Sequence, residues 1–142
     1  MSKKTSESVM RKEVVRLLKP LHAISVENGV SAGTPDVNCT LGWIELKSLA
    51  KPAKDDTVVE CRHFTAQQKL WLRQRWAYYG GAWVLIKIGG CWLLFDGPTA
   101  AKEIGNRTFN ELKKLSCMSW NGIPTSEGLI KALRVCWPDQ EE

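Results

Sequence analysis

Two acids and a lysine in the first third of the chain have the types and spacing of a metal-dependent hydrolytic site. Asp36 follows Pro35, and Glu45-Leu46-Lys47 begins nine residues later. Carboxylates from two adjacent strands can supply oxygens to a hard cation such as Mg²⁺, and the backbone carbonyl of Leu46 could provide another. Lys47, beside Glu45, could hold or help deprotonate a water molecule and balance charge on a scissile phosphate. The pattern predicts metal-assisted hydrolysis of a phosphodiester.

Two strands must position these residues. We expect them from Asp36 to Thr40 and from Trp43 to Ser48, joined in a hairpin by the two residues between them. In the second strand, alternation places Glu45 and Lys47 on one face with Trp43, and the apolar side chains on the other, so that one face is core and the other carries charge. The alternative is structural, because exposed strands often carry Glu-x-Lys pairs and Pro-Asp is a common turn dipeptide.

A helix is expected before the strands, over roughly residues 7 to 19, with Ser6 as its N-cap. Glu7 falls inside its apolar stripe, whereas Glu13 lies on the edge of the stripe. An acid that faces inward suggests a role in the site. The alternative is that Glu7 only favours the positive end of the helix dipole.

A second helix is expected from Thr65 to Tyr79, because Thr65-Ala66-Gln67-Gln68 matches a capping box and Gly80-Gly81 follows. Gln68 begins the stripe that packs against the sheet, while Lys69 and Arg73 face outward. The capping box alone explains Gln68 without any catalytic role.

The remaining elements complete an α/β protein. We expect a short strand over His22 to Glu27, a hairpin of two strands over 82–88 and 91–95, and short helices over 99–104, 109–115 and 126–135. The order predicts a mixed β-sheet flanked by helices, in a single domain over residues 1–138. We expect the acidic tail, 139–142, to be disordered.

The folded part of the chain is basic. The 142 residues include 20 Lys+Arg and 15 Asp+Glu, and three of the acids lie in the last four residues, which leaves 12 acids against 20 basic residues in 1–138. This balance favours a polyanionic partner through counterion release. The alternative is that these side chains form solvated helix faces. The residues expected to bind nucleic-acid phosphates are Lys12, Arg16, Arg62, Lys69 and Arg73.

Several classes of protein are excluded. No apolar run approaches the ~18 residues that cross a bilayer, and residues 1–7 lack the hydrophobic segment of a secretory signal, so we expect a cytoplasmic protein without a membrane partner. The five cysteines are scattered and include no Cys-x-x-Cys pair, and only two histidines accompany them. We therefore expect most of the cysteines to be buried thiols in a reducing compartment, and we expect no zinc site. No small-molecule cofactor is expected.

Residues 7 to 88 resemble the PD-(D/E)XK nuclease superfamily, and more narrowly its VRR-NUC branch. In that branch an acid opens the first helix, a Gly-x-Pro-Asp turn enters a strand, Glu-x-Lys follows on the next strand, and a Gln opens the following helix. The matching residues here are Glu7, Gly33-Thr34-Pro35-Asp36, Glu45-Leu46-Lys47 and Gln68. The resemblance implies a restriction-endonuclease-like αβββαβ core.

The resemblance also implies roles. Asp36 and Glu45 would bind the metal, with Leu46 and Glu7 as further ligands, Lys47 would serve the nucleophilic water, and Glu7 and Gln68 would complete the site. Glu13 is the alternative to Glu7. A histidine beside Arg62 is more often a surface residue, and the alternative for His63 is a role as a base.

The implied function is that of an Mg²⁺- or Mn²⁺-dependent, structure-selective DNA endonuclease. Small stand-alone VRR-NUC proteins of phages and bacteria look like homodimeric Holliday-junction resolvases, which would place this chain in a host cytoplasm if a phage encodes it. The apolar segments Cys91 to Leu94 and Leu133 to Trp137 could form the dimer interface. The alternatives are a flap or nicking nuclease of the same fold, a non-catalytic nucleic-acid-binding subunit, and a basic α/β interaction protein.

Overall fold

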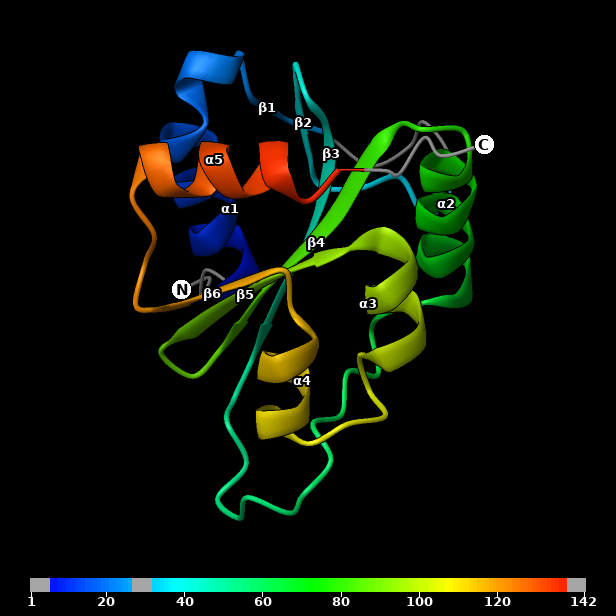
Figure 1. The fold of residues 1–142 in the computed structure, drawn as a ribbon, viewed down its shortest axis with the longest axis vertical. Coiled ribbons are helices and arrows are strands. Elements are labelled where there is room, and N and C mark those ends of the chain that lie inside the picture. Colours follow the sequence, from blue (N-terminus) through cyan, green and yellow to red (C-terminus); the bar gives the residue numbers. More distant parts are fainter. Residues whose placement is uncertain (1–5, 27–31, 138–142) are drawn as a thin grey trace, which may run out of the picture.

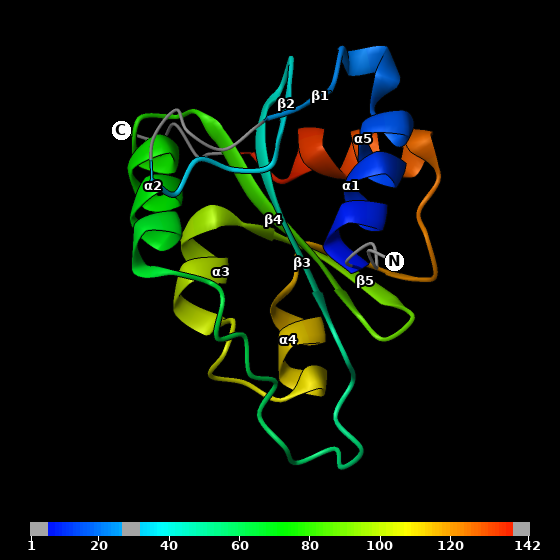
Figure 2. The ribbon, with the colours of Figure 1, turned by 180° about the vertical axis from the view of Figure 1, so that it is seen from behind.

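The computed structural model describes residues 6–26 and 32–137, and these form a six-stranded sheet with helices on both faces (Figures 1 and 2). The strands lie in sequence order from β1 to β6; β3 and β4 are parallel and every other neighbouring pair is antiparallel. The elements are α1 (Ser6–Leu17), the 3-10 helix η1 (Lys19–Leu21), β1 (Ile24–Ser25), β2 (Val37–Cys39), β3 (Gly42–Leu49), α2 (Ala66–Ala77), β4 (Gly81–Ile88), β5 (Cys91–Asp96), α3 (Gly97–Glu103), α4 (Phe109–Leu115), β6 (Met118–Asn121) and α5 (Ser126–Val135).

Two apolar clusters hold the layers together, one on each face of the sheet. Helices α1 and α5 cover the face that carries Ile44 and Leu46, and α2, α3 and α4 cover the face that carries Val84 and Ile86 (Figure 1). The parallel strands β3 and β4 are connected through α2, as a crossover requires. The predicted class, a mixed sheet flanked by helices, is confirmed.

The face of β3 that carries charge differs from the expectation. Glu45 and Lys47 do lie on the face opposite Ile44 and Leu46, but each of the two charged residues is only 2% exposed. This face is covered by α2 and by the segment that leads to it, which includes the buried Phe64. The charged side chains therefore lie inside the protein, where water screens them little.

Several element boundaries also differ from the prediction. Ser6 is the first helical residue of α1 and not its cap. Strand β1 is limited to Ile24–Ser25, because η1 extends to Leu21 and is capped by His22, whose φ is 54°. Helix α2 ends at Ala77, and Tyr79, with a φ of 65°, lies outside it and is 48% exposed. Strand β6 was not predicted. Glu27 and the tail 139–142 lie outside the described residues.

The apolar segment of β5 that was a candidate dimer interface is part of the core, since Trp92, Leu93 and Leu94 are buried. At the C-terminal end, by contrast, Val135 is 75% and Trp137 37% exposed. No helix in residues 6–26 and 32–137 has the length and apolar character to cross a membrane.

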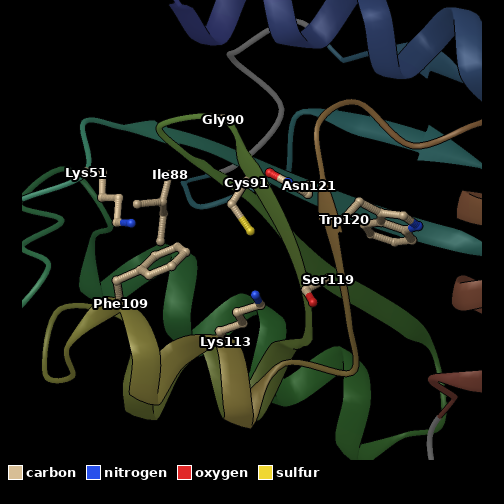
Figure 3. A pocket seen from close by; sticks show the side chains of 9 residues that line it. All are labelled: Lys51, Ile88, Gly90, Cys91, Phe109, Lys113, Ser119, Trp120 and Asn121. Carbon is tan, nitrogen blue, oxygen red and sulfur yellow. The ribbon is translucent and has the colours of Figure 1, made fainter. Parts of the chain in front are cut away.

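An open hollow of about 450 Å³ lies where the β4–β5 turn meets α4 and β6 (Figure 3). Two lysines and a thiol line it with Phe109, over which the amine of Lys51 lies 4.6 Å from the ring centre. None of the residues predicted for the site lines this hollow, which sets it apart from the candidate active site.

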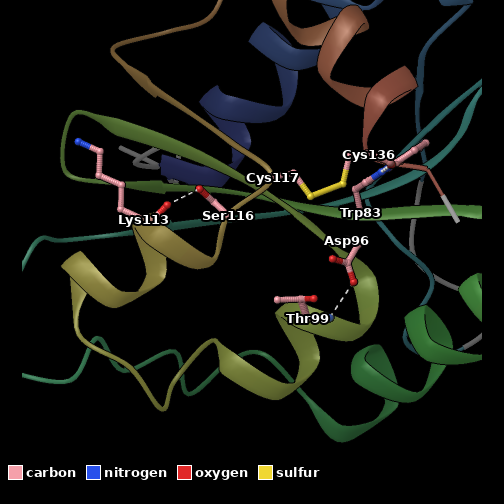
Figure 4. Close-up of a disulfide and its surroundings, with 7 residues drawn as sticks. All are labelled: Trp83, Asp96, Thr99, Lys113, Ser116, Cys117 and Cys136. Carbon is pink, nitrogen blue, oxygen red and sulfur yellow. Dashed lines mark hydrogen bonds between the residues drawn. A yellow bond between two sulfur atoms is a disulfide. The ribbon is translucent and has the colours of Figure 1, made fainter. Parts of the chain in front are cut away.

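The cysteines do not all remain free thiols. A disulfide joins Cys117 and Cys136, 19 residues apart, whose Cα atoms are 6.1 Å apart (Figure 4). The expectation of free thiols is wrong for this pair, because the fold brings the end of α5 beside the start of β6, a proximity that sequence spacing does not reveal. Cys39, Cys61 and Cys91 are free.

Candidate active site

Asp36, just before β2, lies opposite Glu45 of β3. The antiparallel register pairs Val37 with Ile44, so the next pair outward is Asp36 with Glu45, on the same face of the sheet. Asp36 immediately precedes β2, and its Oδ2 accepts a hydrogen bond from the backbone amide of Leu46 at 2.9 Å. This bond holds the Asp36 carboxylate beside the strand that carries Glu45.

The turn before Asp36 needs glycine at Gly33. Its φ is +86°, and a Cβ there would lie 2.5 Å from the backbone oxygen of Gln67. Only a residue without a side chain allows the loop to lie this close to the first turn of α2. The Gly-x-Pro-Asp turn therefore passes close to the first turn of α2 before it reaches Asp36.

Glu45 is buried and only partly satisfied. Its Oε2 lies 3.2 Å from the Lys47 amine and accepts a hydrogen bond from Gln68 Nε2 at 3.3 Å, while its Oε1 is buried without a hydrogen-bond partner. Burial, and after it the negative charge of Asp36, raise the pKa of Glu45 to about 8, against the opposing effect of Lys47.

Lys47 Nζ has three oxygen partners, which account for all three of its N–H donors. Besides Glu45, it donates to the backbone oxygen of His63 and to Oε1 of Gln68, each at 3.1 Å. The ring of Phe64 lies 5.4 Å from the amine. These contacts fix the position of a buried cation next to the two carboxylates.

Gln68 forms the predicted capping box, and its side chain also contacts Glu45 and Lys47. Its side-chain Oε1 accepts a hydrogen bond from the backbone amide of Thr65 at 2.9 Å, and its backbone amide donates to the Thr65 hydroxyl at 3.2 Å. These two bonds form the predicted capping box. The same side-chain amide connects Glu45 with Lys47. The N-terminus of α2 is thereby attached to the site.

Glu7, and not Glu13, is the acid of α1 that reaches this network. Glu7 Oε2 lies 2.6 Å from His63 Nε2, and the backbone oxygen of His63 accepts from Lys47. Glu13 is half-buried, and no ion pair of it is found in the described part of the chain. Glu7 contacts His63 and does not form a three-acid cluster with Asp36 and Glu45.

Sequence reasoning named His63 only as an alternative base, and it did not predict that Arg11 would pair with Asp36. His63 was taken as a surface residue, and its ring is indeed 48% exposed, but it lies between Glu7 and Lys47. Arg11, one helical turn after Glu7, places a guanidinium nitrogen 3.4 Å from Asp36 Oδ1. The only sequence signal for Arg11 is its spacing from Glu7.

The donor set fits a hard divalent cation. Asp36 and Glu45 are two carboxyl groups side by side, and Glu45 Oε1 is a buried oxygen without a hydrogen-bond partner. Since the N–H and C=O of one strand residue point to the same side, the Leu46 carbonyl lies on the side where its amide meets Asp36. A cation bound by oxygens would offset the repulsion between the ionised Asp36 and Glu45, and it would give Glu45 Oε1 a partner.

The predicted phosphate-binding residues differ in how close they lie to the site. Lys69 shares the ring of Phe64 with Lys47, at 5.3 Å from its centre, and the exposed Arg73 lies one helical turn beyond it. Arg62 is exposed and pairs with Glu60 at 3.2 Å. Lys12 and Arg16 lie on exposed positions of α1, the helix that carries Glu7.

Comparison with known proteins finds similarity at the level of the fold. No protein-family model matches the chain, and no curated protein matches its sequence. Among solved structures, it is similar to Hjc, a Holliday junction resolvase from the archaeal hyperthermophile Archaeoglobus fulgidus, with a TM-score of 0.50 and 14% identity over 87% of this chain and 98% of that one. The chain has this restriction-endonuclease-like resolvase fold. The likeness establishes the fold.

Proposed function

We propose that this chain is a metal-dependent, structure-selective DNA endonuclease of the PD-(D/E)XK superfamily and its VRR-NUC branch, and that it resolves Holliday junctions as a homodimer. The observation that carries the proposal is the half-buried Asp36 beside the buried Glu45 and Lys47, with Gln68 connecting the last two. The resolvase fold supports it.

Asp36 and Glu45 are the residues that would hold Mg²⁺ or Mn²⁺, with the Leu46 carbonyl as a further donor. Glu7 would join them only after leaving His63, or would act through water. When bound, the cation supplies Lewis-acid chemistry at a phosphate and counters the charge of the two carboxylates.

Lys47 is the residue that would orient the attacking water and balance charge on the phosphate. Because all three N–H donors of Lys47 already have partners, the amine must exchange one of these partners for water or substrate. The bond to Gln68 is the easiest to exchange, since Gln68 Oε1 keeps the Thr65 amide as its donor. Glu45 and the His63 carbonyl would then keep the amine in place.

Basic residues on α1 and α2 would hold phosphates on either side of the cut. Phosphate contacts of this kind position a duplex without reading its sequence, which suits recognition of DNA shape. Two identical subunits would present two active sites, and a four-way junction has two strands to cut symmetrically.

The test is cleavage of a four-way junction, a flap and a linear duplex, with and without Mg²⁺. We expect metal-dependent cutting of the junction by the wild type, and its loss in Asp36→Ala and Lys47→Ala. Lys102→Ala, at an exposed position of α3, is the matched control and should cut normally.

Each other outcome has a defined meaning. Cutting that survives Asp36→Ala or Lys47→Ala contradicts the assignment of the site. Selective cutting of the flap favours a flap nuclease, and junction binding without cutting favours a non-catalytic subunit. Light scattering on the isolated protein tests the homodimer.

A further inference from the structure

Three side chains with metal-binding atoms meet at the end of β5, and none of them belongs to the candidate active site. Asp96 ends β5, Cys117 precedes β6 and Cys136 follows α5, and their ligand atoms all lie within 4.8 Å of one another (Figure 4). In residues 6–26 and 32–137, this is the one place where three such side chains come so close.

We propose that, after reduction of the Cys117–Cys136 disulfide, Asp96, Cys117 and Cys136 bind one Zn²⁺ ion. This site would be chemically unlike the pair of Asp36 and Glu45, and it does not depend on the proposed nuclease function. Thiolates are soft ligands that select zinc over magnesium, whereas a site of oxygen ligands selects the harder ion.

The ligand number and spacing suit zinc. Three protein ligands and one water complete a tetrahedral site. Zn–S bonds of about 2.3 Å put two sulfurs about 3.8 Å apart in such a geometry, so the cysteines must separate from bonding contact. Their Cα atoms are 6.1 Å apart, which leaves that separation to rotation of the side chains.

Asp96 can take part without giving up its structural role. Its Oδ2 caps α3 by accepting from the Thr99 amide at 2.9 Å, and this leaves the other carboxylate oxygen available (Figure 4). Asparagine would preserve the cap, because its amide oxygen accepts the same hydrogen bond. The contribution of the carboxylate to metal binding can therefore be tested without unfolding α3.

The surroundings hold Cys136 in place. It is 9% exposed, and its backbone oxygen accepts a hydrogen bond from the indole nitrogen of Trp83. Trp137 packs against Trp83, with ring centres 5.5 Å apart. Cys117 is exposed, which gives a reductant and a metal ion access to the pair.

Disulfide and metal are alternative ways of joining the same residues. Reduction takes two electrons and two protons from a dithiol, which itself becomes a disulfide, and yields two thiols. Zinc binding then displaces the two thiol protons. Reoxidation returns two electrons to an acceptor disulfide and must release the ion, so the redox state would control occupancy.

The test is anaerobic titration of the reduced full-length protein with Co²⁺, a coloured substitute for Zn²⁺. We expect one equivalent to give the near-ultraviolet thiolate-to-cobalt absorption with tetrahedral visible bands, and one equivalent of Zn²⁺ to abolish both. Cys117→Ser and Cys136→Ser should lose the thiolate absorption, and Asp96→Asn should bind Co²⁺ at least tenfold more weakly. Cys91→Ser is the matched control and should keep the full signal.

Three results would overturn the proposal: reduced wild-type protein without the thiolate absorption, absorption that survives both cysteine variants, or equal signals from the oxidised and reduced forms. The Asp36→Ala variant separates this site from the other, because it should bind Co²⁺ through thiolates as the wild type does. Loss of nuclease activity in that variant would not bear on the zinc site.

Discussion

The protonation of Glu45 gives a prediction that needs no knowledge of the substrate. Burial, with the added effect of Asp36, raises its pKa from 4.5 to about 8 in the folded chain. Replacing Glu45 by glutamine keeps the size of the side chain and an oxygen acceptor for Lys47, but removes the charge. The variant should therefore lose the part of the pH dependence of stability that belongs to this carboxyl group.

The free energy of unfolding falls as the pH rises, because the folded chain binds the Glu45 proton more tightly than the unfolded chain does. Between pH 4.5 and pH 8 the folded chain keeps a proton on Glu45 that the unfolded chain has released. Its contribution to stability is therefore fully present below pH 4.5 and is lost as the pH rises through 8. With about 1.36 kcal/mol per pKa unit, the loss between pH 5.5 and pH 9 is on the order of 3 kcal/mol.

Urea unfolding at these two pH values, in EDTA, measures the effect. The free energy of unfolding of the wild type should fall by about 3 kcal/mol more than that of Glu45→Gln over the interval. Glu127→Gln, at an exposed position of α5, should behave as the wild type. Parallel pH profiles for the wild type and Glu45→Gln would refute the argument that burial holds a proton on this residue.

Three further predictions concern the elements around the site. Gly33→Ala should destabilise the fold by about 1–3 kcal/mol more than Gly105→Ala in urea unfolding, because both have positive φ but only Gly33 would press a Cβ against backbone; equal losses would discount the contact. Glu7→Gln should slow junction cleavage and Glu13→Gln should not, and the reverse would assign the role to Glu13. Binding of the junction, measured by anisotropy, weakens with salt, and Lys69→Ala should make the slope of log K against log salt concentration shallower by about 0.9. An unchanged slope would remove Lys69 from the DNA contacts.

Local patterns in the sequence were enough to place the main parts of the site. The alternation in β3 sets Glu45 and Lys47 on one face. The hairpin turn between β2 and β3 sets Asp36 opposite Glu45. The capping box located Gln68 at the start of α2. These features depend on neighbours in sequence or on a hairpin register, which the residues themselves specify.

Contacts between distant segments could not be predicted in this way. The burial of Glu45 and Lys47 depends on the segment before α2, which has no regular periodicity, and the contact of Glu7 with His63 joins residues 56 positions apart. The disulfide depends on the end of α5 returning beside β6. Strand β6 has four residues and is half-buried or exposed throughout, so it lacks the apolar alternation that marks a strand.

Single-turnover cleavage of a four-way junction by Asp36→Asn tests the central claim most directly, because asparagine keeps the shape of the side chain and an acceptor for the Leu46 amide. With Mg²⁺ present and binding measured in parallel, the variant should bind the junction within a few-fold of the wild type and cut at least a hundredfold more slowly, about 2.7 kcal/mol in the barrier. Cleavage at a rate close to that of the wild type would contradict a metal site formed by Asp36 and Glu45.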